Sequence, residues 1–339
     1  IIPIVVSQKL FGTSPLVYFI APLIATIAMS LFLFRILAKI IGDKIAFLSV
    51  LLLAFLPEMA KDSSHPRVST FATLYLITTL YILFHIHDRR PETAPKYYTF
   101  IISASICTFF MYMASESSLF ALPGLMFIVF SIRSSIRDLA VYSISLFSFY
   151  LSETLLYFLF TPFSLGRLSV IRSHVESLDN LPMQSLLGLF YRYHPDKNDI
   201  YLTILIFTAI IAAIYLLSKY KDKRLQALSL IMFSYLFFLT FLLKSLNPLI
   251  PFNNFRERYF IPVVPIMWCL VTIALYRLIE KWRGIKDAGP SKEAGSNHFF
   301  ILSGFLITVT GITLFWNVLK FQYYRNDAFR CWQTNPLYL

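Results

Sequence analysis

LFGTSPLVYFIAPLIATIAMSLFLF, residues 10–34, contains no charged side chain and exceeds the roughly 20 apolar residues that a helix needs to cross a bilayer. Further apolar runs follow at 45–57, 68–87, 97–115, 117–132, 139–166, 200–218, 225–243, 259–276 and 294–319. Only helices and closed barrels satisfy their backbone in lipid, and these runs lack the strict alternation of barrel strands. The sequence therefore predicts an all-α, multi-pass bundle of about ten transmembrane helices, forming one domain over 1–339.

Composition agrees with a membrane protein. The chain is 57% hydrophobic and 14% charged, and its 34 Phe and 20 Tyr suit lipid-facing and interfacial surfaces. The net charge of +12 does not indicate nucleic acid, because no basic, aromatic-interleaved soluble segment accompanies it. Three widely spaced cysteines, two of them within apolar runs, argue against a disulfide framework or a cysteine metal cluster.

The distribution of Lys and Arg predicts the orientation. The short loops on one side of the alternation hold 17 of the 30 Lys and Arg, so the positive-inside rule makes them cytoplasmic. These loops are 35–44, 88–96, 133–138, 219–225 and 277–296. The outer side then receives 1–14, 58–67, 114–117, 161–199, 244–258 and 318–339. Short loops of this kind favour a prokaryotic plasma membrane over the endoplasmic reticulum.

The largest predicted outer loop, 161–199, mixes apolar residues at helical spacing with charged ones. We expect one or two amphipathic helices on the membrane surface, acting either as a brace on the bundle or as part of a substrate site. His174 and His194 within it are weaker candidates for a site. Because the chain starts without Met inside an apolar segment, we also expect it to be part of a longer protein.

The stretch FLPEMAKDSSHPRVSTF, residues 55–71, concentrates ionic groups between two predicted spans. Glu58, Asp62, His65 and Arg67 could together hold a divalent metal ion or an anionic lipid headgroup. The competing interpretation is an ordinary solvated loop, where charges cost little.

A second cluster is NPLIPFNNFRERYFIPVVP, residues 247–265. Arg256 and Arg258 immediately precede a span that begins with Tyr259 at the interface. The planar guanidinium matches phosphate oxygens bidentately, so this pair suits the phosphate of a lipid carrier. The alternative is that both side chains only snorkel to the interface, which is less favoured on the outer face.

Two isolated carboxylates complete the candidates. Glu116 lies in a tight outer turn, YMASESSLF, where a plain turn residue is the competing interpretation. Glu153 lies inside the run 139–166, about two-thirds of the way across by helix rise. An intramembrane carboxylate is costly and usually faces a cavity or a partner, which makes Glu153 a weaker functional candidate.

Three segments resemble the GT-C membrane glycosyltransferases, the group that includes protein O-mannosyltransferases and lipid A aminoarabinose transferases. They are the stretch beginning LFGTSPLVYFIAPLIAT, with its polar turn at 58–67; SICTFFMYMASESSLFALPGLMFIVF, residues 105–130; and RERYFIPVVPIMW, residues 256–268. The last, similar to the family's Arg-Tyr-Phe-x-x-Pro-x-x-Pro helix start, is the most specific.

The resemblance implies transfer of a sugar from a polyprenyl-phosphate donor to an acceptor lipid, glycan or protein on the outer membrane face. It implies inversion at the anomeric carbon, with a carboxylate as general base and Arg side chains, with or without a metal ion, stabilising the departing phosphate. The family's catalytic Asp would precede Ile1, so no residue here is assigned as the base. Arg256 and Arg258 would take the phosphate role, while Glu58, Asp62, His65 and Glu116 would line the acceptor or metal side.

Two other classes stay open. A transporter or flippase for lipid-linked or small anionic solutes could use the same Arg pair together with Glu153. A non-catalytic membrane subunit, or a protein resembling an oligosaccharide polymerase, is the third possibility. Charges gathered at the predicted outer ends, rather than at mid-span, favour interfacial chemistry over transport.

Overall fold

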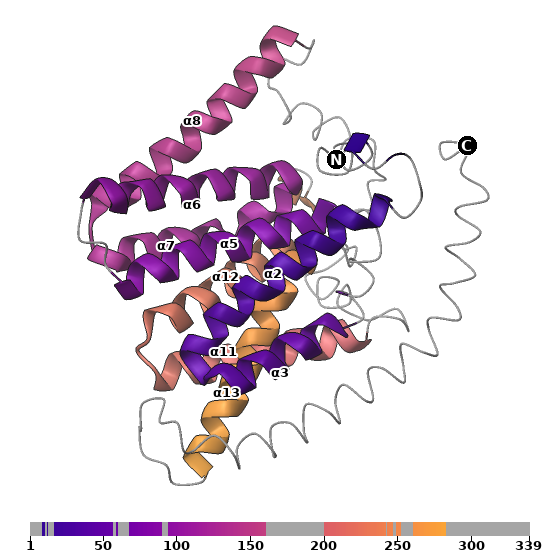
Figure 1. Cartoon of the computed structure of the whole chain (residues 1–339), viewed down its shortest axis with the longest axis vertical. Helices are drawn as coiled ribbons and strands as arrows, with labels where there is room; N and C mark the ends of the chain where they lie inside the picture. The colour runs from indigo at the N-terminus through magenta and orange to yellow at the C-terminus, as the bar shows by residue number, and fades with distance from the viewer. Residues whose placement is uncertain are drawn as a thin grey trace, which may run out of the picture.

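The computed structural model describes residues 9–10, 12, 17–56, 59, 68–89, 94–160, 200–241, 243–246, 249–251 and 260–282. Within them the α-helices are α2 (Val17–Ile41), α3 (Asp43–Ala54), α5 (Val68–Arg89), α6 (Ala94–Ala114), α7 (Leu122–Arg133), α8 (Ile136–Phe160), α11 (Ile200–Lys219), α12 (Lys223–Phe241) and α13 (Val264–Trp282). Two 3-10 turns, η1 (Glu116–Ala121) and η3 (Ile261–Val263), precede α7 and α13. The predicted all-α membrane bundle is confirmed (Figure 1).

Five described helices are long and apolar enough to cross a membrane: Ile20–Ile41, Ser69–Asp88, Pro95–Ala114, Ile136–Phe160 and Ile261–Trp282. The runs predicted at 45–57 and 117–132 form α3 and α7, which have 12 residues each and are too short to span alone. The predicted run 294–319 and the amphipathic loop 161–199 lie outside the described residues. The chain is an integral membrane protein of the multi-pass kind.

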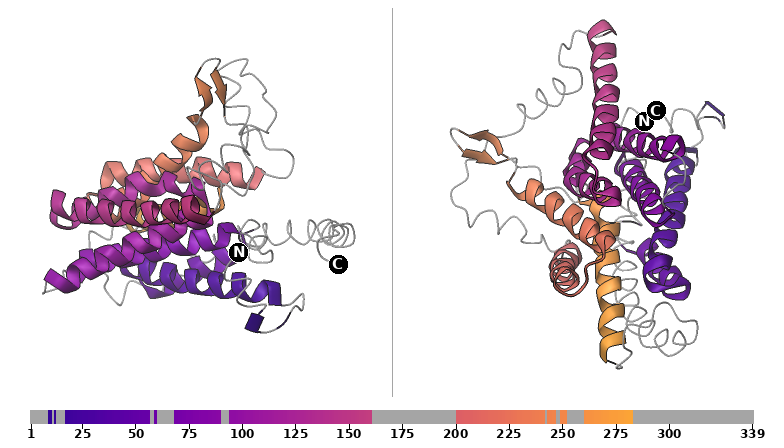
Figure 2. Two further views of the ribbon diagram at one scale, coloured as in Figure 1. Left: turned by 90° about the horizontal axis from the view of Figure 1, so that it is seen from above. Right: turned by 90° about the vertical axis from the view of Figure 1, so that its left-hand side faces the viewer.

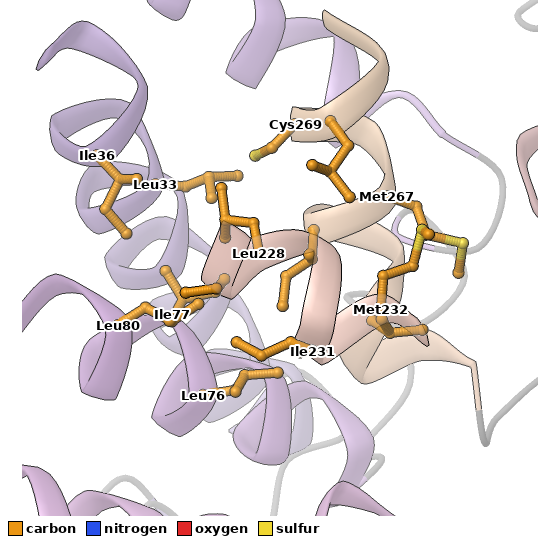
Figure 3. Packing of buried hydrophobic residues seen from close by; sticks show 14 of the residues in the cluster. Leu33, Ile36, Leu76, Ile77, Leu80, Leu228, Ile231, Met232, Met267 and Cys269 are labelled. Carbon is orange, nitrogen blue, oxygen red and sulfur yellow. The ribbon is translucent and has the colours of Figure 1, made fainter. Parts of the chain in front are cut away.

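Helix α5 lies at the centre of one half of the bundle, in contact with α2 on one side and α6 on the other. In the other half, α12 packs on α7, and α11 packs on α13. The halves meet in an apolar core where Leu76, Ile77 and Leu80 of α5 face Leu228 and Ile231 of α12 (Figure 3). Helix α13 contributes Met267 and Cys269 to the same core.

Helix α8 contacts α6 and α7 but otherwise stands apart from the bundle (Figure 1). Only 11% of the residues in its membrane-span window are buried, compared with 72% for α13. Its apolar side chains therefore form a surface that the bilayer covers.

Close helix contacts in this bundle involve small and polar residues. This is usual in membranes, because lipid tails are as apolar as the side chains and the hydrophobic effect does not drive helices together there. A Cβ atom added to Gly124 of α7 would lie 2.2 Å from Ile231 Cγ1 of α12. Between α3 and α13, the Trp268 indole N–H donates to the Ser49 carbonyl oxygen at 2.9 Å, and the Ser49 and Thr272 hydroxyls lie 3.1 Å apart.

The two ends of the bundle differ. At one of them, which we call the basic end, Lys39 of α2 pairs with Asp88 of α5 at 2.7 Å, and Arg224 of α12 reaches the same carboxylate at 3.5 Å. The Lys223 ammonium donates to the Ser131 carbonyl oxygen of α7 at 3.3 Å. The five loops predicted to be cytoplasmic therefore share one end as far as the structure describes them, as alternation requires.

The opposite end, which we call the rim end, holds the last residues of α3, α6, α8 and α12 and the first residues of α5, α11 and α13, together with η1 and η3. Beyond α12, β1 (Leu243–Leu246) and β2 (Leu249–Pro251) form an antiparallel pair with Leu246 opposite Leu249. This pair, drawn in orange, stands clear of the helices in both views of Figure 2. It is an addition to the predicted all-α fold, and the turn-forming Asn247 and Pro248 separate its strands in sequence.

Candidate active site at the rim end of the bundle

Most predicted site residues fall outside the described part of the chain. These are Arg256, Arg258, Tyr259, Glu58, Asp62, His65, Arg67, His174 and His194. For Glu116 the backbone is described, as the first residue of η1, but the side chain is not. Glu153 is fully described. What the structure gives is the framework to which these residues attach.

The segment containing Arg256 and Arg258 is followed by a firmly packed turn. Phe260 is 4% exposed, and its carbonyl oxygen accepts the backbone N–H groups of Val263 and Val264 at 2.9 and 3.1 Å. Pro262 suits this first turn because it lacks an N–H group that would need a partner. The turn η3 contacts both α5 and α12, so the point where this segment enters the bundle is fixed.

A hydroxyl network holds the turn that carries Glu116. The Ser118 hydroxyl donates to the Met111 and Ser115 carbonyl oxygens at 2.9 and 2.5 Å, closing the end of α6. The Ser117 hydroxyl lies 3.2 Å from the Tyr235 hydroxyl of α12.

Helix α12 also contacts η1, the turn that carries Glu116, through Ser234, Tyr235 and Phe238. The Ser234 hydroxyl donates to the Phe120 carbonyl oxygen at 2.7 Å. The Phe120 ring meets the rings of Tyr235 and Phe238 at 5.7 and 5.5 Å between centroids. Sequence reasoning identified the polar turn but missed Ser234 and Tyr235, because nothing local distinguishes them from other residues in an apolar run.

Helix α12 is the common support of the rim end. It contacts η1 before α7 and η3 before α13, and η3 in turn contacts α5. The first described residue after the Arg67 segment is Val68 of α5, and the first after the Tyr259 segment is Phe260, just before η3. Both therefore lie at elements that converge at one end. The described elements that border the clusters predicted at 55–71, 112–120 and 247–265 thus lie at the same end of the bundle.

Glu153 is a buried carboxyl group in the part of α8 where the neighbouring apolar side chains are mostly exposed. Its side chain belongs to a residue that is 7% exposed, whereas Leu151 and Leu155 on either side are 55% and 56% exposed. One turn earlier, the Tyr150 ring meets the Tyr112 ring of α6 at 5.7 Å, two residues before α6 ends. The register of α6 and α8 therefore places Glu153 near the level of the turn that carries Glu116.

Among the residues that the structure describes, no group of three or more His, Cys, Asp or Glu could hold a metal ion. Of the residues predicted for a metal side, Glu58, Asp62 and His65 lie outside this part of the chain and only the backbone of Glu116 is described.

Comparison with known families and structures agrees with the architecture. Residues 4–158 match the family model described as dolichyl-phosphate-mannose-protein mannosyltransferase. The fold is similar to that of ArnT from Cupriavidus metallidurans in its apo state, with a TM-score of 0.53 and 14% identity, over 83% of this chain and 49% of that chain. The family match over residues 4–158 and the shared fold agree with the resemblance to the GT-C membrane glycosyltransferases.

This chain spans about half the length of ArnT from Cupriavidus metallidurans. A further similarity is to the Archaeoglobus fulgidus oligosaccharyltransferase solved with Zn and sulfate, with a TM-score of 0.47 and 14% identity, over 88% of this chain and 42% of that chain. No curated protein shows significant sequence similarity to the chain.

Proposed function

We propose that this chain belongs to an enzyme that transfers a sugar from a polyprenyl-phosphate carrier to an acceptor lipid, glycan or protein, at the rim end of the bundle. The observation that carries the proposal is the convergence of η1, η3 and the start of α5, all supported directly or indirectly by α12. This convergence supports the proposal, because the segments with the candidate ionic residues adjoin these elements, and a lipid-linked phosphate and a polar acceptor could meet at such a membrane boundary.

In this reaction an acceptor hydroxyl oxygen attacks the anomeric carbon of the sugar, and the bond from that carbon to the carrier phosphate oxygen breaks. The acceptor proton passes to a carboxylate, and the carrier leaves as polyprenyl phosphate. Attack opposite the leaving group inverts the anomeric carbon.

Arg256 and Arg258 take the leaving phosphate, since two guanidinium forks can stabilise the charge that develops on its oxygens. Tyr259 places the pair at the membrane interface, directly before the packed turn that begins at Phe260.

The acceptor side is assigned to Glu58, Asp62, His65, Arg67 and Glu116. Carboxylate and imidazole groups are also ligands for divalent cations, so a metal ion at this side would act by neutralising phosphate charge. Loss of transfer in EDTA, with recovery on addition of Mg²⁺ or Mn²⁺, tests that part of the assignment separately.

By orientation, the rim end faces the outside of a prokaryotic plasma membrane, because the basic end carries the Lys-rich and Arg-rich short loops. Cysteine accessibility tests this in intact cells. In a Cys331→Ser background, a cysteine introduced at the exposed Lys221 must stay unlabelled by an impermeant maleimide, and one introduced in 161–199 must label.

The direct test of the phosphate role is a comparison of three variants. Arg256→Ala and Arg258→Ala should abolish sugar transfer while the proteins stay monodisperse in detergent. Arg35→Ala removes an exposed arginine from the half of α2 nearer the basic end, and should leave transfer unchanged. Full transfer in both rim variants would remove the assigned role.

A transporter or flippase remains the second candidate, favoured by the buried Glu153 in a membrane helix. The two functions differ in chemistry, because a flippase moves the carrier without breaking the bond between sugar and phosphate. Release of unglycosylated polyprenyl phosphate from a labelled donor supports transfer, and intact donor appearing in the opposite leaflet supports transport.

A further inference from the structure

The cations of the basic end fall into two groups. Lys39 and Arg224 pair with Asp88, Arg224 pairs also with Asp222 at 2.8 Å, and Arg277 pairs with Glu280 at 3.0 Å. Arg133, the last residue of α7, and Arg137, in the first turn of α8, form no ion pair with any carboxylate in the described part of the chain. Both are exposed.

Aromatic rings hold these two arginines in place. The Arg133 guanidinium carbon lies 3.6 Å from the centroid of the Tyr97 ring, and that of Arg137 lies 5.4 Å from the centroid of the Tyr98 ring. The Tyr97 hydroxyl donates to Asp138 Oδ2 at 2.5 Å, and both residues are almost fully buried. A guanidinium group that stacks on a ring keeps its N–H donors free at its edge.

The surrounding charge is positive. Lys96 is exposed in the same turn of α6 as the two tyrosines, and Lys223 reaches the Ser131 carbonyl oxygen near the end of α7. The carboxylate that the described residues place beside this cluster is that of Asp138, which is 1% exposed and accepts a hydrogen bond from the Tyr97 hydroxyl. An anion arriving from outside would therefore meet the arginines first.

An apolar surface adjoins these charges. Arg137, Ile144, Leu151 and Leu155 are spaced by seven, seven and four residues, which places them on one face of α8. The three apolar residues are 65%, 55% and 56% exposed. This face runs from the arginines into the membrane, so a ligand with both an anionic head and long hydrocarbon chains fits both parts at once.

We propose that Arg133 and Arg137, on the platform of Tyr97 and Tyr98, bind the phosphate of an anionic phospholipid whose acyl chains lie along α8. The site lies at the end of the bundle opposite the candidate active site, and its assignment does not depend on the proposed function. A soluble phosphate compound would use the arginines but leave the exposed face of α8 without a role.

Native mass spectrometry of the purified protein, delipidated and then incubated with phosphatidylglycerol or phosphatidylcholine, tests the proposal. The wild type should retain one phosphatidylglycerol in preference to phosphatidylcholine. Arg133→Gln/Arg137→Gln should weaken that retention roughly tenfold or more, since each basic residue near an anionic lipid contributes about 1 kcal/mol. Lys44→Gln/Lys221→Gln removes the same charge from two other exposed residues of the basic end and should leave retention within about twofold of wild type.

Three results would overturn the proposal: equal loss in both double variants, undiminished retention in Arg133→Gln/Arg137→Gln, or displacement of the lipid by equimolar inorganic phosphate. If the arginine double variant unfolds, Arg137→Gln alone decides, because Arg137 is exposed and stacks on Tyr98, whereas Arg133 stacks on Tyr97, which bonds to the buried Asp138. It must lower phosphatidylglycerol retention for the proposal to stand.

Discussion

Replacing Gly124 by alanine tests the packing that holds η1 in position. The new Cβ atom would lie 2.2 Å from Ile231 Cγ1, 2.7 Å from Ile231 N and 2.9 Å from Ile231 Cα. Ordinary carbon contacts are about 3.5–4.0 Å, so α7 and α12 must separate by about an ångström. Two of the three atoms are backbone, and no side-chain rotation can relieve them.

The size of the effect follows from two opposing terms. Overpacking of this kind costs about 1–3 kcal/mol, while alanine gains about 1 kcal/mol over glycine in helix propensity. Because the clash involves backbone, we expect it to dominate and the Tm in detergent to fall by several degrees, at about 2–4 °C per kcal/mol for a chain of this class. The separation should also lower sugar transfer, since α12 supports η1.

Thermal unfolding followed by size-exclusion chromatography measures the change. Ile231→Ala removes the side-chain contact but also the packing of Ile231 in the core. The Tm of Gly124→Ala/Ile231→Ala should therefore fall by less than the sum of the two single decreases. Gly42→Ala serves as a contrast, because its Cβ meets nothing within 4 Å and any cost there comes from its φ of +83°. A Gly124→Ala protein as stable as wild type, or more stable, would refute the reasoning.

Three further predictions follow from described contacts. Trp268→Phe removes the indole bond to the Ser49 carbonyl and should lower stability by about 1 kcal/mol in thermal unfolding, whereas an unchanged Tm would show that the bond is replaced by another. Burial alone would raise the pKa of Asp222, but hydrogen bonds and charge from Arg224 hold that pKa below the usual range of a carboxyl group. Its ion pair therefore stabilises the protein at neutral pH and the stabilisation is lost as pH falls through that lowered pKa, so Asp222→Asn should flatten the acid side of a Tm profile against pH. Glu153→Gln should reduce sugar transfer while Ser152→Ala, on the exposed residue beside it, should not; equal activity of both would exclude Glu153 from the site.

The apolar runs predict most of the helices because the bilayer imposes a length on each span, and this requirement is visible in a single sequence. The alternation of Lys and Arg places the five basic loops together for the same kind of reason, and contacts such as Lys39–Asp88 bear this out. The 12-residue helices α3 and α7 appear in the sequence only as short apolar runs. Their position and tilt in the bundle depend on the helices that pack against them, which the sequence does not show.

The supports of the candidate site could not be predicted in the same way. Ser234 and Tyr235 lie more than a hundred residues from the turn that they hold, and the bond between Tyr97 and Asp138 joins two helices. Such pairings depend on tertiary packing, and no periodic pattern in the neighbouring sequence indicates them. The sequence also does not predict that α8 is exposed, because a lipid-facing helix and a buried helix can have the same hydropathy.

The most direct measurement of the central claim is the position of a lipid phosphate in the bound protein. Cryo-electron microscopy of the purified protein in nanodiscs with polyprenyl phosphate should show phosphate density at the rim end, about 2.8 Å from the guanidinium nitrogens of Arg256 and Arg258. A rim end without phosphate density at saturating polyprenyl phosphate, or one with both arginines directed into bulk water, would contradict the account.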